Sequence, residues 1–247
     1  MTQRVAVVTG GAGGLGTAIC KALADAGRKV VATDMTADTA GGQAWLDECR
    51  NQGYQFELLG MDVTDFDACK ASFKRIEETV GPVDVLINCA GITRDGTFKR
   101  MTADQWHAVI STNLDSVFNV TKHVVDGMMD RGFGRIVNIS SLNGQKGQFG
   151  QSNYSAAKAG MHGFTMALAQ ETARKGVTVN TVSPGYVGTQ MVMAVPEDVR
   201  AKIVEQIPVG RLGKPEEIAD SVVFLQREGS GFITGMDLSI NGGQYMH

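Results

Sequence analysis

Short apolar runs alternate along the chain with longer stretches in which apolar residues recur at helical spacing. The apolar runs predict strands over residues 5–10, 29–34, 56–62, 83–88, 135–140, 177–183 and 237–240. The periodic stretches predict helices over residues 16–26, 65–80, 102–131 and 153–175, and a further helix that begins at Pro215. Thr102 and Gln105 fit a capping box at the start of the third of these helices.

This order of elements predicts an α/β fold with a doubly wound parallel sheet of about seven strands and helices on both faces. The strands are apolar along their whole length, as expected where both faces of a sheet are covered. No repeat, linker or low-complexity segment interrupts the pattern, so we expect residues 1–247 to form a single domain. Ligands of such sheets bind at the carboxyl ends of the strands.

The composition argues against several classes of protein. The net charge of −3 is unlike that of nucleic-acid binders, which carry a basic face. No apolar run approaches the roughly 18 residues that a membrane span needs, and we find no signal peptide. The four cysteines are scattered and no metal-ligand spacing appears, which predicts a reduced cytoplasmic protein without a metal site.

The segment "TGGAGGLG" (9–16) lies between the first predicted strand and the first predicted helix. Glycines let the backbone turn tightly and approach a ligand, and the free N–H groups of a helix start attract a pyrophosphate. Gly10, Gly14 and Gly16 therefore predict a dinucleotide site, since a strand, a glycine turn and a helix follow one another. The fold is then of the Rossmann type.

Asp34 ends the second predicted strand. A carboxylate at this position can accept hydrogen bonds from both hydroxyls of the adenosine ribose, and it repels a 2′-phosphate. No Arg or Lys lies in the glycine loop or directly after Asp34. We expect NADH to be preferred and NADPH to be a weaker alternative. Arg4 and Lys29 are the nearest basic residues, and we expect them at the opposite edge of the sheet.

The polar stretch "SSLNGQKGQFGQSNYSAAK" (140–158) follows a predicted strand and ends on a Tyr and a Lys. Tyr154 and Lys158 are four residues apart and share one helical face, and Ser141 at the strand end can meet them. A Tyr hydroxyl can give a proton to a carbonyl oxygen that Ser141 also holds. The Lys158 ammonium, together with an oxidised nicotinamide, would lower the pKa of that hydroxyl.

These motifs together resemble the tyrosine-dependent short-chain dehydrogenases/reductases, and the resemblance covers the whole chain. Further matching segments are "NCAG" (88–91), with Cys89 where the family has Asn, "STNL", and "SPGYVGT" (183–189). The resemblance implies that Ser141, Tyr154, Lys158 and Asn113 are catalytic, and that Asn113 holds a proton-relay water through its backbone. It implies cofactor contacts by Gly10, Gly14, Leu15, Gly16, Asp34, Asp62, Val63, Asn88, Ala90, Gly91, Tyr154, Lys158, Pro184, Gly185, Val187 and Thr189.

A narrower resemblance, to the acetoacetyl-CoA reductases of polyhydroxybutyrate synthesis, rests on "CAGITRDGTFKRMT", "NGQKGQFGQSNYSAAKAGMHGFTMALAQE" and "TVNTVSPGY". It implies reduction of acetoacetyl-CoA to (R)-3-hydroxybutyryl-CoA by a homotetramer in the bacterial cytoplasm. We expect residues 189–211 to form a substrate lid. The implied substrate contacts are Asp95, Ser141, Gln148, Phe149, Gln151, Tyr154 and Tyr186.

Two other functions are compatible with parts of the pattern. A 3-oxoacyl-[acyl-carrier-protein] reductase of fatty-acid synthesis has the same fold and the same catalytic trio. A non-catalytic protein that senses dinucleotides would keep the glycine loop, but it would have little reason to keep Ser141, Tyr154 and Lys158 together.

Overall fold

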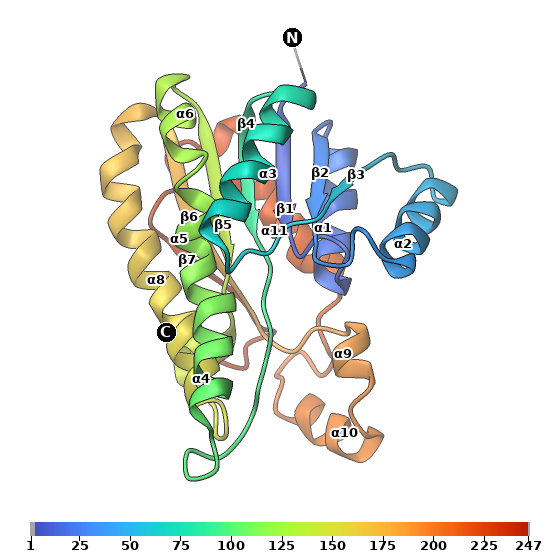
Figure 1. The fold of residues 1–247 in the computed structure, drawn as a ribbon. Coiled ribbons are helices and arrows are strands. Elements are labelled where there is room, and N and C mark those ends of the chain that lie inside the picture. Colours follow the sequence, from blue (N-terminus) through green and yellow to red (C-terminus); the bar gives the residue numbers. More distant parts are fainter. Residues whose placement is uncertain (1–2, 247) are drawn as a thin grey trace.

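One parallel sheet of seven strands runs through the computed structural model, which describes residues 3–246 (Figure 1). The strand order is β3-β2-β1-β4-β5-β6-β7, which confirms the predicted doubly wound sheet. The strands are β1 (Val5–Thr9), β2 (Lys29–Thr33), β3 (Glu57–Leu59), β4 (Val83–Asn88), β5 (Gly134–Ile139), β6 (Val177–Pro184) and β7 (Asp237–Ile240). All seven lie where the apolar runs predicted strands.

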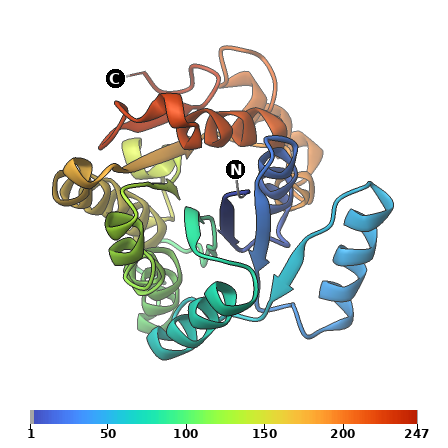
Figure 2. The same ribbon diagram turned by 90° about the horizontal axis from the view of Figure 1, so that it is seen from above.

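Side chains of the strands alternate between two apolar cores, one on each face of the sheet. In β1, Val5 and Val7 belong to one core, and Ala6 and Val8 belong to the other. Helices on both faces bury these side chains, and Figure 2 shows the two helical layers from above. One layer holds α3 (Phe66–Thr79), α4 (Ala103–Ile110), α5 (Ser116–Thr121), α6 (Val125–Asp130) and α8 (Ser152–Thr172), and the other holds α1 (Gly14–Asp25), α2 (Ala40–Asn51) and α11 (Pro215–Gln226).

The prediction of one continuous helix over 102–131 is wrong. The capping box of Thr102 and Gln105 opens α4 as predicted, but a π-helical turn (Ser111–Asp115) follows, and a turn at 122–124 separates α5 from α6. No Pro or Gly marks either interruption. Within the π turn, the side chain of Asn113 binds both the N–H and the carbonyl of Ile92, so a tertiary contact accompanies the change of winding.

Several helices were not predicted from the pattern. Helix α2 begins with "AGG", and the two glycines in its first turn have low helix propensity, so the sequence pattern does not predict a helix there. Within the polar stretch after β5, Ser141 caps a short helix, α7 (Leu142–Lys146). The segment 189–211 contains α9 (Gln190–Met193) and α10 (Glu197–Glu205). In the described part of the chain, no helix has the length and apolarity to cross a bilayer.

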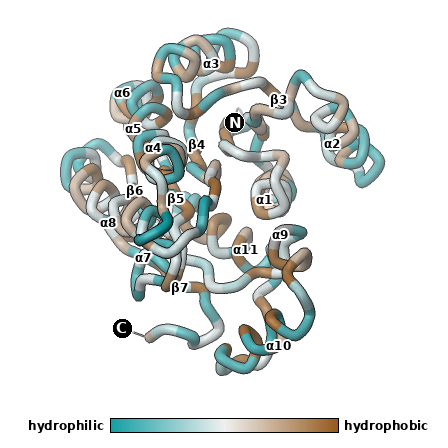
Figure 3. The backbone as a smooth tube through the Cα atoms, turned by 60° about the horizontal axis from the view of Figure 1, so that its bottom comes forward, coloured by the Kyte–Doolittle hydropathy of each residue, from teal (hydrophilic) through white to brown (hydrophobic). Residues whose placement is uncertain are grey.

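Helices α9 and α10 project from the sheet at the end where the strands finish (Figure 1). None of the described residues of α10 is buried, and the tube of this segment is mixed in hydropathy (Figure 3). Thr189, directly before α9, lies against Gly14 at the start of α1. This weakly packed segment therefore borders the glycine loop.

Candidate active site

A cleft of about 560 Å³ opens at the carboxyl ends of the strands. It spans the point between β1 and β4 where the strand order reverses, which is where ligands of doubly wound sheets bind. Most of the residues singled out from the sequence line it. They are Gly10, Gly14, Leu15, Gly16, Asp34, Ala90, Gly91, Ser141, Gln151, Tyr154, Lys158, Pro184, Gly185, Tyr186, Val187 and Thr189.

The glycine loop is packed so closely that side chains are excluded from it. Gly10 has φ +64°, and a Cβ on it would lie 2.9 Å from Cα of Ala90. A Cβ on Gly16 would overlap the carbonyl oxygen of Gly10. No acidic residue occupies the first turn of α1, so its N–H groups and positive dipole end face the cleft without a carboxylate. The loop suits a pyrophosphate.

Cys89, which stands where the matching motif has Asn, lines the cleft and also packs against one of the two apolar cores. Thr9 Oγ1 accepts hydrogen bonds from the backbone N–H groups of Cys89 and Ala90, at 3.0 and 3.1 Å. Burial raises the pKa of the Cys89 thiol to about 11. A thiol with that pKa stays protonated and unreactive at neutral pH.

Asp34 lies on the wall of the cleft and shapes its own turn. Its Oδ1 accepts hydrogen bonds from the N–H and the hydroxyl of Thr36, at 3.0 and 2.8 Å. Arg4 pairs with Glu228, and the Lys29 ammonium donates to the carbonyl of Val80, so both basic side chains are engaged at the amino ends of the strands. They lie at the edge of the sheet opposite the cleft, as the sequence predicted.

Ser141, Tyr154 and Lys158 meet in the cleft. The Ser141 oxygen accepts a hydrogen bond from the N–H of Asn143 at 3.1 Å, and the Ser141 side chain lies on the lining of the cleft with Tyr154. The ammonium of Lys158 lies 5.7 Å from the centre of the Tyr154 ring. A hydroxyl has one proton to donate and two lone pairs that accept, so the Ser141 hydroxyl can accept from Asn143 and still donate its proton within the cleft.

In the structure, the pKa of Tyr154 is raised, whereas the sequence predicted that the Lys158 ammonium and an oxidised nicotinamide would lower it. Burial raises the pKa of the Tyr154 phenol, and the hydrogen bond from Ser141 only partly offsets this. Lys158 is buried and donates to the carbonyl of Ile139, and its pKa falls to about 8 because of burial. The chain's own groups therefore do not lower the pKa of Tyr154, and the phenol stays protonated, as a proton donor requires.

Asn113 lies behind the cleft in the π-helical turn. Its Oδ1 accepts from the N–H of Ile92 and its Nδ2 donates to the carbonyl of Ile92, both at 2.8 Å. The side chain is fully buried, and Gly91 fits between it and Lys158. With the side chain engaged in this way, only the main chain of Asn113 is left to act on the cleft.

A row of amide side chains crosses the rim of the cleft. Asn143 donates to Gln151 at 2.9 Å, and Gln151 donates to Asp95 at 2.8 Å. Asn143 was not singled out from the sequence, since nothing in the local pattern distinguishes it from its polar neighbours. Gln148 and Phe149 do not line the cleft, although Phe149 is 87% exposed on the same loop.

Three predicted cofactor residues lie outside the lining of the cleft. Asp62 accepts hydrogen bonds from the N–H and hydroxyl of Thr64, which repeats the turn made by Asp34. Val63 is buried in the core. Asn88 is buried too, and its amide donates to Asn138 at 2.8 Å. Their contacts support the strand ends from which the cleft is built.

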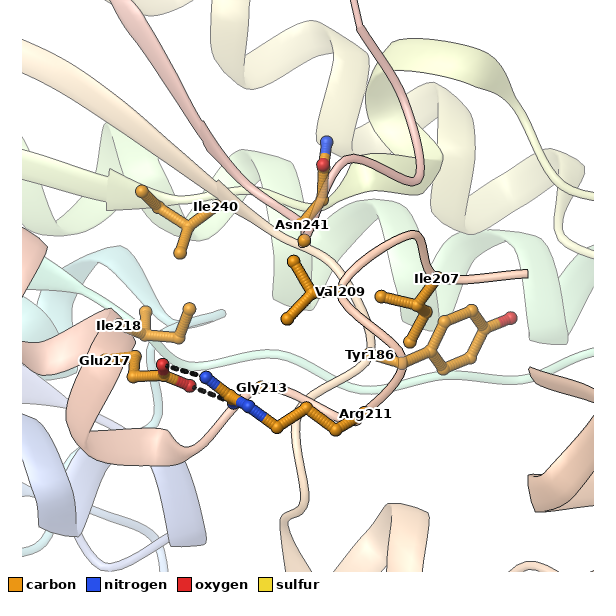
Figure 4. Close-up of a pocket in the computed structure, with 10 residues that line it drawn as sticks. Tyr186, Ile207, Val209, Arg211, Gly213, Glu217, Ile218, Ile240 and Asn241 are labelled. Atoms are coloured by element: carbon orange, nitrogen blue, oxygen red, sulfur yellow. Dashed lines mark hydrogen bonds and ion pairs between the residues drawn. The ribbon is translucent and has the colours of Figure 1, made fainter. Parts of the chain in front are cut away.

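A second, smaller cavity of about 120 Å³ lies under the end of the segment 189–211 (Figure 4). Apolar side chains of Ile207, Val209 and Ile218 line it, and the Tyr186 hydroxyl points away from them. Arg211 donates to both carboxylate oxygens of Glu217, at 2.8 and 2.6 Å. This ion pair joins the end of the segment to the start of α11.

Many known proteins have sequences similar to that of this chain. The family model for short chain dehydrogenases matches residues 4–200. The chain is 60% identical to the acetoacetyl-CoA reductase of Cupriavidus necator, over all of both chains. It is 56% identical to the acetoacetyl-CoA reductase of Allochromatium vinosum, over 99% of both. It is 44% identical to the 3-oxoacyl-[acyl-carrier-protein] reductase of Vibrio harveyi, over 98% of both.

Proposed function

The chain belongs to the short-chain dehydrogenase family, and on that premise we propose that it reduces acetoacetyl-CoA to (R)-3-hydroxybutyryl-CoA. The observation that carries the proposal is that Ser141 and Tyr154 line one cleft together with the buried ammonium of Lys158, which lies 5.7 Å from the centre of the Tyr154 ring. Such a trio serves to protonate a carbonyl oxygen. The choice of substrate rests on full-length identity of 56–60% to two acetoacetyl-CoA reductases.

The chemistry follows from the protonation of the trio. A reduced nicotinamide dinucleotide supplies the hydride when it is bound. Tyr154, kept protonated by burial, gives its proton to the 3-oxo oxygen, and Ser141 donates a hydrogen bond to the same oxygen. The Lys158 ammonium stabilises the phenolate that remains. The main chain of Asn113 holds a water that returns the proton.

The cleft fits a dinucleotide, and its shape suggests how each part is held. The glycine loop and the start of α1 bind the pyrophosphate, and Asp34 accepts hydrogen bonds from the adenosine ribose. The negative charge of this carboxylate favours NADH, with NADPH as the weaker alternative. The remaining proposed cofactor contacts in the cleft are Leu15, Ala90, Gly91, Pro184, Gly185, Val187 and Thr189, while Asp62, Val63 and Asn88 lie outside its lining and support the strand ends.

The thioester enters over the rim of the cleft. Gln151 and Asp95 supply polar groups there, and the exposed ring of Phe149 supplies an apolar surface. Gln148 and Tyr186 complete the substrate contacts. Residues 189–211 act as a lid that closes over the thioester and excludes water.

Assembly and location follow from the same proposal. Phe118 on α5 and Met166 on α8 are each 53% exposed, while Val117 and Val120 are buried on the other side of α5. Apolar residues on two sides of these helices support a closed homotetramer. The four free cysteines and a CoA thioester substrate support a cytoplasmic location.

The alternative is a 3-oxoacyl-[acyl-carrier-protein] reductase, and the 44% identity to the Vibrio harveyi enzyme supports it. A comparison of kcat/KM on acetoacetyl-CoA and on the acetoacetyl carrier protein decides between the two. We expect the CoA thioester to be the better substrate. A clear preference for the carrier-bound substrate would overturn the choice, and an absence of NADH or NADPH oxidation with either would favour a non-catalytic dinucleotide sensor.

A further inference from the structure

A polar cluster joins the carboxyl ends of β5 and β6 and the first residue of β7 to helix α8. His162 lies one turn after Lys158, and its Nε2 is 2.9 Å from the hydroxyl of Ser140. The same nitrogen is 3.4 Å from the hydroxyl of Ser183 and 3.4 Å from a carboxylate oxygen of Asp237. Gln145, on α7, donates to Asp237 at 2.7 Å. Nothing in the reaction proposed above uses this cluster.

Counting protons shows which atom donates at the centre of the cluster. A hydroxyl has one proton to donate. The Ser140 hydroxyl donates to the backbone carbonyl of Lys158 at 2.9 Å, and the Ser183 hydroxyl donates to Asp237 at 2.6 Å. Neither proton is left for His162, so Nε2 carries a proton and donates it to the Ser140 oxygen. His162 is therefore the donor that holds the Ser140 hydroxyl in its orientation.

The Ser140 hydroxyl in turn fixes the catalytic lysine. Lys158 is held at both ends by consecutive residues, because its ammonium donates to the carbonyl of Ile139 at 2.7 Å and its own carbonyl accepts from Ser140. Ser141, the partner of Tyr154, follows directly in the chain. A displacement of Ser140 would shift the Lys158 main chain and the Ser141 hydroxyl together.

We propose that His162, backed by Asp237 and Ser183, is a positioning residue that sets the distance between the Lys158 ammonium and the Tyr154 phenol. The inference rests on the proposed function of the trio. It explains why a partly exposed imidazole on α8 and a carboxylate on β7 face each other at a place where apolar side chains would pack without needing donors. Misplacement of a catalytic group by about 1 Å can slow a reaction by up to roughly a hundredfold.

Tyr154 ionisation in the complex with NAD⁺ provides a readout that needs no substrate. Phenolate absorbance is titrated for wild type and for His162→Leu, and the signal of Tyr154 is isolated by subtracting the titration of Tyr154→Phe. His162→Leu removes the donor, whereas His162→Gln retains an N–H at a similar reach. The matched control is Thr172→Val, which removes a buried hydroxyl that bonds two carbonyls near the other end of α8.

We expect the Tyr154 pKa to rise by about one unit in His162→Leu, because the ammonium is held less well beside the phenolate. We expect it to stay near wild type in His162→Gln and Thr172→Val. In steady-state assays the kcat of His162→Leu should fall at least roughly tenfold while KM for the dinucleotide changes little. If His162→Leu does not fold, Ser140→Ala tests the same link, with the same expected rise.

An unchanged Tyr154 pKa in the folded His162→Leu or Ser140→Ala variant would overturn the inference. So would an equal rise in Thr172→Val, because the effect would then be a general loss of stability. A wild type that does not turn over acetoacetyl-CoA would contradict the proposed substrate, yet the titration would still test the positioning role.

Discussion

The ammonium nitrogen of Lys158 lies 2.7 Å from the carbonyl oxygen of Ile139, at the point where β5 ends. Lys158 is 3% exposed, and burial lowers its pKa from 10.5 to about 8. The fold thus holds a cation where an apolar side chain would be more stable, with one backbone carbonyl as its nearest oxygen partner. We interpret this as stability given up for the chemistry of Tyr154.

Replacing this cation should stabilise the protein. A pKa lowered by that amount corresponds to about 3 kcal/mol, from which the lost bond to Ile139 must be subtracted. We expect Lys158→Met to raise the free energy of unfolding in urea by about 1–3 kcal/mol at pH 7. The exposed Lys175, changed to Met, is the control and should have little effect.

The stability advantage of Lys158→Met over wild type should decrease as the pH rises. The pKa of Lys158 is lower in the folded state, so the unfolded chain binds the extra proton between about pH 8 and 10.5. Wild type therefore gains stability relative to the variant as the pH rises through this window. The advantage of Lys158→Met should shrink by pH 10. An advantage that is equal at pH 7 and pH 10 would contradict the lowered pKa.

Asp34 should decide between the two nicotinamide dinucleotides. Hydrogen bonds to a carboxylate contribute roughly 1.5–3 kcal/mol each, and a 2′-phosphate would lose them. We expect kcat/KM with NADH to exceed that with NADPH by roughly tenfold to a hundredfold. Asp34→Asn keeps an acceptor for Thr36 and removes the charge, and Asp34→Gly removes both.

Both Asp34 substitutions should narrow or reverse the preference for NADH over NADPH, and Asp34→Asn should do so without disturbing the turn with Thr36. Initial rates with each dinucleotide at subsaturating concentration measure this preference. A wild-type preference for NADPH would show that Asp34 does not bind the ribose.

The glycine loop should not accept a methyl group at Gly16. A Cβ there would overlap the carbonyl oxygen of Gly10, so Gly16→Ala must displace the loop that faces the pyrophosphate. We expect the dissociation constant for NADH, measured by calorimetry, to rise at least roughly tenfold, or about 1.4 kcal/mol. Gly41→Ala, in the first turn of α2, meets only Thr39 at 3.5 Å and should leave binding unchanged. Unaltered binding by Gly16→Ala would place the pyrophosphate elsewhere.

The exposed apolar residues of α5 and α8 should be covered by other copies of the chain. Light scattering at micromolar concentration should give four times the 26.3 kDa of one chain. Phe118→Lys places a charge on a side chain that is 53% exposed, and the mass should fall. A monomer mass for wild type would reject the tetramer.

Patterns that depend on neighbours in sequence predicted much of this fold. Each strand, the glycine loop and the capping box of Thr102 and Gln105 follow from spacing alone, and the structure has them at those positions. The helix α2 was missed because Gly41 and Gly42 weaken its signal, although Thr39 caps it. The π turn around Asn113 could not be predicted, because no Pro or Gly lies within it.

Features of the candidate site that depend on distant residues were also out of reach. Ser140, His162 and Asp237 come from separate elements, and only the folded sheet brings them together. The lowered pKa of Lys158 arises from burial, which a spacing of four residues after Tyr154 does not reveal. The sequence thus predicted that Ser141, Tyr154 and Lys158 meet, while their protonation and the cluster around His162 required the structure.

The central claim is that Tyr154 gives the proton when acetoacetyl-CoA is reduced. The most direct measurement is the rate of NADH or NADPH oxidation with acetoacetyl-CoA by wild type and by Tyr154→Phe, with dinucleotide binding measured for both. We expect wild type to form (R)-3-hydroxybutyryl-CoA, and Tyr154→Phe to bind the dinucleotide normally while its kcat falls by about 10²–10⁴-fold. A Tyr154→Phe variant that retains near-full activity, or a wild type that is inactive on this thioester, would contradict the claim.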